Sequence, residues 1–166
     1  MDKSERTFIN QKESEVEQIV VFTIDYQLYA LPLKTVLRVI HIVEIMKLPK
    51  APEIIKGIIN VAGQIIPVVD VRKRFGFVTR EIDPNDQLVI ADTGKRKIAL
   101  WVDTVNGVNG MTLQQNFETK EIMPFAQFIK GVAKIENDMI LIYDLEQFLS
   151  LSEEMVLAQA LLNKNK

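Results

Sequence analysis

The sequence predicts a mainly β protein made of two similar small units, with a few short helices. Short β-branched runs separated by turn residues recur along the chain, which is typical of small barrels or a sandwich. One strand–turn–strand pattern also occurs twice, because residues 55–75 align with residues 129–149 at an offset of 74. A second, weaker sequence similarity aligns residues 29–36 with residues 98–105 at an offset of 69. This period is too long for a solenoid repeat, so we interpret it as the duplication of a small β-domain.

The two copies of the repeated pattern share their chemistry as well as their order. Each begins with Ile-Lys-Gly, and in the first copy the two β-branched arms are separated by Ala62-Gly63-Gln64. Such arms suit a pleated, mostly buried surface, and Gly63 allows a tight turn. Asp70 and Asp144 follow the second arm of their copies. We expect each carboxylate to cap a short helix there.

The other elements follow from turn residues and apolar runs, taken in chain order. Further strands are expected over residues 19–24, 28–31, 36–43, 87–91 and 97–102. Residues 47–52 are expected to be irregular because they contain two prolines. The glycines of residues 105–110 favour a bend, and residues 112–128 show no clear period and are interpreted as a loop. The expected organisation is a flexible leader (1–17), one domain (18–149, with subdomains of about 18–80 and 81–149) and a C-terminal helix with its tail (150–166).

The C-terminal helix has a recognisable start signal. Ser150 followed by Glu153 is a capping-box pattern. We expect a narrow apolar stripe of Met155, Ala158, Leu161 and Leu162 to dock on one of the two units.

Composition excludes several classes of protein. Of the 166 residues 48% are hydrophobic, so a real core is expected and wholesale disorder is excluded. The net charge of −2, with both signs interspersed, does not indicate a nucleic-acid or membrane-surface binder. The chain has no cysteine, so disulfides and thiolate metal sites are impossible. Residues 1–18 lack the apolar segment of a signal peptide, and no apolar run reaches the ~18 residues that span a bilayer.

Residues for catalysis are missing as well. His41 is the single histidine and lies in an apolar run, where a core or edge position is the more common role. No glycine-rich phosphate loop or nucleophile-elbow pattern is present. Asp70 and Asp144 fit helix caps better than a catalytic pair because they occupy matching repeat positions. We therefore expect no enzyme activity, no metal and no cofactor.

Four blocks of the chain together resemble the CheW family of chemotaxis coupling proteins. The blocks are residues 21–30, 55–72, 98–103 and 142–146, and the likeness extends from about residue 18 to about residue 155. The resemblance implies two packed SH3-like five-stranded β-barrels without catalysis. It also implies a cytoplasmic adaptor, recruited to membrane-associated receptor arrays without inserting into the membrane. Its partners would be the cytoplasmic tip of a chemoreceptor (a methyl-accepting chemotaxis protein) and the regulatory domain of the CheA histidine kinase.

The resemblance also implies a receptor-binding groove between the barrels, while the kinase-contact residues stay unknown. The groove residues carried over position by position are Val36, Arg38, Lys56, Gly57, Asn60, Ala62, Val105 and Val108. The family usually has glutamate at the position of Arg38 and arginine at the position of Ala62, and losing both leaves no orphaned charge. Two alternatives stay open: a chemosensory pathway with a non-flagellar output, and a barrel that binds a small ligand or nucleic acid.

Overall fold

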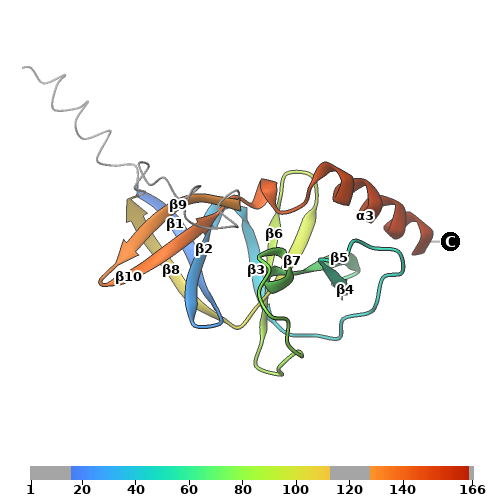
Figure 1. Cartoon of the computed structure of the whole chain (residues 1–166), viewed down its shortest axis with the longest axis horizontal. Coiled ribbons are helices and arrows are strands. Elements are labelled where there is room, and N and C mark those ends of the chain that lie inside the picture. Colours follow the sequence, from blue (N-terminus) through green and yellow to red (C-terminus); the bar gives the residue numbers. More distant parts are fainter. Residues whose placement is uncertain (1–15, 113–127, 165–166) are drawn as a thin grey trace, which may run out of the picture.

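A computed structural model of the chain describes residues 16–112 and 128–164. In these ranges the chain forms two five-stranded sheets and a few helices (Figure 1). The first sheet contains β1 (Val16–Ile24), β2 (Gln27–Pro32), β8 (Thr104–Thr112), β9 (Ile129–Ile135) and β10 (Asp138–Tyr143). The second contains β3 (Val36–His41), β4 (Ile55–Val61), β5 (Gln64–Asp70), β6 (Gln87–Asp92) and β7 (Lys97–Val102). The helices are η1 (Leu33–Thr35), α2 (Val71–Arg74), η4 (Leu145–Gln147) and α3 (Leu151–Lys164).

Each sheet is one SH3-like barrel, as the resemblance implied, and we call them barrel A (β8-β1-β2-β10-β9) and barrel B (β3-β6-β7-β5-β4). Barrel B is continuous over residues 36–102, whereas barrel A takes strands from both sides of this range (Figure 1). The two sheets therefore do not follow the expected division into residues 18–80 and 81–149. The physical reason is that each half of the chain contributes strands to both sheets, through parallel pairings of β2 with β10 and of β5 with β7.

The duplication is visible in the strand register. In the β4–β5 hairpin the register shifts at Lys56, and in the β9–β10 hairpin it shifts at Lys130, 74 positions later. The parallel pair Val68–Ala99 of barrel B corresponds to the pair Ile142–Ala30 of barrel A by the two sequence offsets. Each repeat copy thus builds the same local structure, although the copies belong to different barrels.

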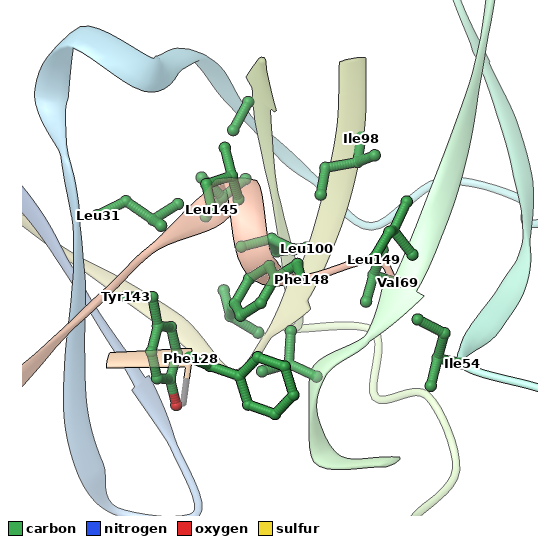
Figure 2. Close-up of a cluster of buried hydrophobic side chains, with 14 of the residues drawn as sticks. Leu31, Ile54, Val69, Ile98, Leu100, Phe128, Tyr143, Leu145, Phe148 and Leu149 are labelled. Atoms are coloured by element: carbon green, nitrogen blue, oxygen red, sulfur yellow. The ribbon is translucent and has the colours of Figure 1, made fainter. Parts of the chain in front are cut away.

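Three clusters of buried side chains hold the molecule together. One lies inside barrel B around Trp101, and one lies inside barrel A around Ile140. The largest, which we call the shared core, takes side chains from both sheets and from α2, η4 and α3. Figure 2 shows side chains of both barrels around Phe148. The ring centroid of Tyr143 lies 5.0 Å from that of Tyr29 and 4.6 Å from that of Phe75.

The strand-to-helix junctions are capped as the sequence predicted. Asp70 accepts a hydrogen bond from the amide of Lys73 at 3.2 Å, and Asp144 accepts one from the amide of Glu146 at 3.2 Å. Each bond satisfies an amide that the start of a helix leaves unpaired. Both carboxylates are therefore structural caps.

Three expectations about local structure need correction. Residues 105–110 do not form a bend: they belong to β8, an edge strand that pairs with β1. Because an edge strand has a ladder partner on one side alone, it tolerates the two glycines. β1 begins at Val16, inside the expected leader, while residues 1–15 lie outside the described residues. The loop expected over 112–128 falls mostly outside them too, but Thr112 belongs to β8 and Phe128 is buried.

Helix α3 docks on barrel B, with the expected capping box in place. The hydroxyl of Ser150 accepts from the amide of Glu153 at 3.1 Å, and the Glu153 carboxylate accepts from the amide of Ser150 at 2.8 Å. The predicted docking stripe is only partly correct: Leu161 packs against the shared core, but Met155 and Leu162 are exposed. The fully buried apolar residues of the helix are Leu157 and Ala160 instead. The helix carries apolar residues on two adjoining faces, so its sequence fits either orientation.

Candidate functional site

An apolar strip lines the edge where the two barrels meet, and we call it the valine strip. It consists of four residues on the edge strands of the two sheets: Val36 and Val39 of β3, and Val105 and Val108 of β8. The sequence offset of 69 relates Val36 to Val105 and Val39 to Val108. The strip is therefore built from two matching halves, one from each barrel.

Cross-strand pairing fixes the direction in which these side chains point. Val36 pairs with Ala91 and Val105 pairs with Phe22, and both partners belong to the shared core. Since directly opposed residues in an antiparallel pair lie on the same face, both valines face the other barrel. They are half-buried and pack against the shared core.

The outer two valines extend this surface into solvent. Val39 pairs with Val89, a member of the shared core, and Val108 pairs with Val20 on the face that also carries Phe22. Their exposed fractions are 37% and 54%. Each half of the valine strip thus places an exposed valine beside a half-buried valine that packs against the shared core.

The two edge strands approach one another where β3 ends and β8 begins. The backbone amide of Val105 donates to Oε1 of Gln87 at 2.7 Å. Gln87 begins β6 and pairs with His41, the last residue of β3. The Gln87 side chain therefore connects the start of β8 to the end of β3, the strand that carries Val36 and Val39.

Arg38 supplies an accessible positive charge on β3. It pairs with Ile90 of the barrel B core, so its side chain leaves the face of β3 opposite to that of Val39. The side chain is exposed, and among the described residues it has no ion-pair partner. Such a guanidinium can form a bidentate contact with a carboxylate of a partner.

The remaining expected groove residues lie on β4 and on the turn that follows it. Gly57 is buried rather than groove-lining, because the carbonyl oxygen of Met46 and the Ile45 side chain cover it. Lys56 is exposed, and its Nζ lies 5.5 Å from the ring centroid of Trp101. Asn60 and Ala62 are exposed at the β4–β5 turn, where Oδ1 of Asn60 accepts from the amide of Gly63 at 2.9 Å.

The closure of barrel B relates this turn to Arg38. Met46 and Ile58 form an antiparallel bridge with hydrogen bonds of 2.9 and 2.8 Å. Because the two segments run antiparallel, the residues that precede Met46 lie toward the same end of the barrel as the residues that follow Ile58. Arg38 and Ala62 consequently lie toward the same end of barrel B, whereas Lys56 lies beside Trp101.

A cluster of charged residues joins the barrels next to Trp101. Arg72 of α2 is fully buried, forms an ion pair with Asp103, and lies 3.2 Å from Asp25 of the β1–β2 turn. Arg80 contacts both oxygens of Asp86 at 2.7 and 2.8 Å and Asp103 at 2.7 Å. Because Asp25 belongs to barrel A and Arg72 to barrel B, the cluster fixes the two barrels relative to one another.

The Trp101 indole is at the centre of this cluster. Its Nε1 donates to Asp86 at 2.8 Å. The guanidinium carbons of Arg72 and Arg80 lie 5.4 and 5.5 Å from its ring centroid, within the range of cation–π attraction. No sequence signal groups these residues, since they come from five separate segments of the chain.

The cluster predicts a loss of stability in acid. Burial acts to raise the pKa of Asp103 and of Asp86, but hydrogen bonds outweigh it and hold each pKa below its usual value. Asp103 accepts from Arg72 and Arg80, and Asp86 accepts from Arg80 and from the Trp101 indole. A lowered folded-state pKa stabilises the fold above the carboxyl group's ordinary pKa near 4, and this contribution is lost as the pH falls through the folded-state value. We expect the free energy of unfolding, measured by urea titration from pH 7 to pH 2.5, to decrease most steeply below pH 4.

A variant assigns this acid dependence to the cluster. Asp86→Asn removes the titrating carboxylate and should flatten the slope below pH 4, whereas Asp92→Asn, an exposed change at the end of β6, should leave the slope unchanged. Equal slopes in the parent protein and in both variants would contradict the assignment.

One residue of the valine strip was missed in the sequence although a signal for it was present. The offset of 69 that relates Val36 to Val105 also relates Val108 to Val39. Applying the repeat to the site residues would have found Val39 before the structure did.

The described residues contain no group of three or more His, Asp or Glu side chains placed to hold a metal ion. His41 is exposed at the end of β3. The helices of the described ranges include none that is long and apolar enough to cross a membrane. The valine strip and Arg38 provide apolar and charged groups with which another molecule can be bound.

Comparisons with known proteins agree with the fold. A family model described as CheW-like domain matches residues 18–153. The chain is 26% identical over 147 residues to the chemotaxis protein CheW of Klebsiella aerogenes, covering 87% of this chain and 88% of that protein. It is 29% identical over 132 residues to the chemotaxis protein CheW of Thermotoga maritima, covering 80% and 87%.

A solved structure supports the same assignment. The crystal structure of the scaffolding protein TtCheW from Thermoanaerobacter tengcongensis superimposes with a TM-score of 0.73 at 33% identity. The match covers 83% of this chain and 90% of that one. Because the family model spans most of the chain and the fold agrees, the chain belongs to the family of CheW-like domain proteins.

Proposed function

We propose that the protein is a non-catalytic adaptor that couples chemoreceptors to a CheA-type histidine kinase in a cytoplasmic chemosensory array at the membrane. In this proposal the valine strip receives the cytoplasmic tip of a receptor, which is a helical hairpin. The kinase binds through a different surface of the same rigid body. The work of the protein is to fix the positions of the two partners relative to one another.

The observation that carries the proposal is the accessible apolar surface at the edge of the shared core. A helix docks through side chains at positions i, i+3, i+4 and i+7 into an elongated apolar surface. The valine strip is elongated because it follows two edge strands, and it is anchored to a well-packed core that keeps its shape. Such a surface fits a rod-shaped partner better than a compact ligand.

Arg38 adds a charge on the other face of the same edge strand, β3. We propose that it pairs with a carboxylate of the receptor helix, because a charge at the rim of an interface affects orientation and partner choice more than affinity. Asn60 and Ala62 are small and uncharged at the same end of barrel B, so they leave room for this contact.

The two modest contacts of an adaptor are sufficient when it is part of an array. Each contact contributes an affinity of its own, and linkage of many copies raises the effective concentration of every partner. The rigid connection of the barrels by the shared core and by the Arg72 cluster supports this geometric role.

A matched pair of substitutions tests the receptor site. Val108→Asp places a charge in the valine strip and should weaken binding to a purified receptor-tip hairpin by about tenfold, a change of roughly 1.4 kcal/mol. Val78→Asp makes the same change outside the strip, at a side chain that is 88% exposed, and should leave affinity unchanged. Isothermal titration calorimetry measures both affinities, and circular dichroism checks that both variants are folded.

The same experiment separates the two partners. Binding of the kinase regulatory domain should be equal for Val108→Asp and for the parent protein, because the kinase uses another surface. If Val108→Asp and Val78→Asp bind the receptor hairpin with equal affinity, the valine strip is not the receptor site.

A further inference from the structure

Helix α3 is a fixed part of the surface of barrel B. The capping box at Ser150 holds its first turn. Glu153 is paired with Arg74 of α2, and Glu154 accepts from Nε of Arg96 at 2.8 Å. Leu157 is completely buried below the helix. Most of α3 lies beyond residue 153, where the match to the family domain ends, and in Figure 1 it projects along the outside of barrel B.

The outward face of α3 carries a continuous apolar stripe that no described residue covers. Leu151, Met155 and Leu162 are 72%, 67% and 61% exposed, and half-buried Ala158 lies between the last two. The four positions are separated by four, three and four residues, so they form one line along the helix. This spacing is that of the a and d positions of a coiled coil, which is the pattern by which one helix packs against another.

The spacing of this stripe (four, three, four) is the same in both directions, which suits antiparallel pairing with a second copy of itself. In an antiparallel pair Leu151 faces Leu162 of the second copy, and Met155 faces its Ala158. A large residue then meets a small one at the centre, and two leucines meet at each end. A twofold interface requires this self-complementarity, because the same patch is used on both subunits.

Charge favours the same arrangement. The first turn of α3 carries Glu153 and Glu154, and its last turn carries Lys164. Glu153 and Glu154 are already paired with arginines of barrel B, so the favourable electrostatic contribution of antiparallel packing comes from the opposed dipoles of the two helices. The residues beside the stripe on its solvent side, Ser152, Gln159 and Asn163, are uncharged, so no like charges meet.

We infer that the protein forms a twofold dimer through antiparallel pairing of α3 with α3 of a second copy. The stripe covers three helical turns, and its contact area is far below the roughly 1,200 Å² of a stable specific interface. The dimer is therefore weak and forms at high local concentration. It links adaptor copies to one another, which is a contact beyond those with receptor and kinase.

Sedimentation equilibrium of the full chain between 10 µM and 1 mM tests the inference. We expect a monomer at the low end and a growing dimer fraction at the high end. Leu162→Glu should raise the dimer dissociation constant at least tenfold, because it places like charges at both ends of the interface. Val156→Glu, also on α3 but outside the stripe, should leave it unchanged. A monomer throughout, or equal effects of the two variants, would overturn the inference.

Engineered thiols test the direction of pairing. The chain has no cysteine, so an introduced cysteine is the sole thiol of the molecule. Leu151→Cys and Leu162→Cys, mixed and treated with a mild oxidant, should form mostly the mixed disulfide dimer. Like positions are separated by about 16 Å in the antiparallel arrangement, given the 1.5 Å rise per residue. Each variant crosslinking with itself as readily as with the other contradicts antiparallel pairing.

Discussion

Replacing Gly57 with alanine is expected to destabilise the protein by about 3 kcal/mol, near the upper end of the cost of overpacking. A Cβ at this position would lie 2.4 Å from the carbonyl oxygen of Met46 and 2.7 Å from Cγ2 of Ile45. That carbonyl accepts the 2.8 Å hydrogen bond from Ile58 that closes barrel B. The backbone must therefore shift and weaken the closure. Urea unfolding monitored by circular dichroism measures the loss.

Gly63→Ala is the matched control for this prediction. Gly63 lies in the same hairpin with φ of +84°, and no other atom would lie within 4 Å of an added Cβ. The alanine costs about 1 kcal/mol through backbone strain alone. Equal losses for the two variants would show that the close approach of Met46 is unimportant. A binding defect of any Gly57 variant has to be interpreted with this instability in mind.

Replacing Arg72 with methionine is expected to destabilise the protein by about 2–3 kcal/mol, since removing one partner of a buried ion pair leaves a charge without compensation. Arg72 is fully buried, while the side chain of Asp103 is 24% exposed and that of Asp25 is 49% exposed. Solvent reaches both carboxylates, so the loss is smaller than for a fully buried group. Methionine preserves most of the apolar stem that packs in this region.

The control for this variant is its neighbour. Lys73→Met removes an exposed charge from the same helix and should change the free energy of unfolding by less than about 0.5 kcal/mol. The difference between the two variants should shrink as the pH falls through the lowered pKa of Asp103, because Arg72 then loses the charge of this partner. A difference that is constant with pH would show that packing, and not charge, determines the effect.

The repeat made local structure predictable but left the pairing between strands open. The two offsets identified both hairpins, both helix caps and the chain order of the strands, because these depend on neighbouring residues. The partner of each central strand could not be inferred, since β2 pairs with a strand that is more than 100 residues away. Contacts of this kind depend on the packing of the whole core.

The candidate site was predictable in part for the same reason. Val36, Val105 and Val108 were expected at the site and lie on the edge strands that form the valine strip. Val39 can be added from the sequence repeat. A glycine at the start of a strand is compatible with close packing, but the segment that covers Gly57 could not be identified because it is irregular and contains no repeat signal. The face of α3 was assigned only in part, because the ion pairs of Glu153 and Glu154 that orient the helix involve distant arginines.

The strand order determines which barrel can fold while the chain is still being synthesised. Barrel B occupies a continuous stretch that ends at residue 102, so it can close while the rest of the chain is still being translated. The β1–β2 hairpin has by then been synthesised, yet its lateral partners, β8 and β10, emerge later. During that interval two apolar edges of the nascent chain stay open to wrong pairing. Completion of barrel A is therefore the late step of biogenesis, and the first strands made are among the last to be enclosed.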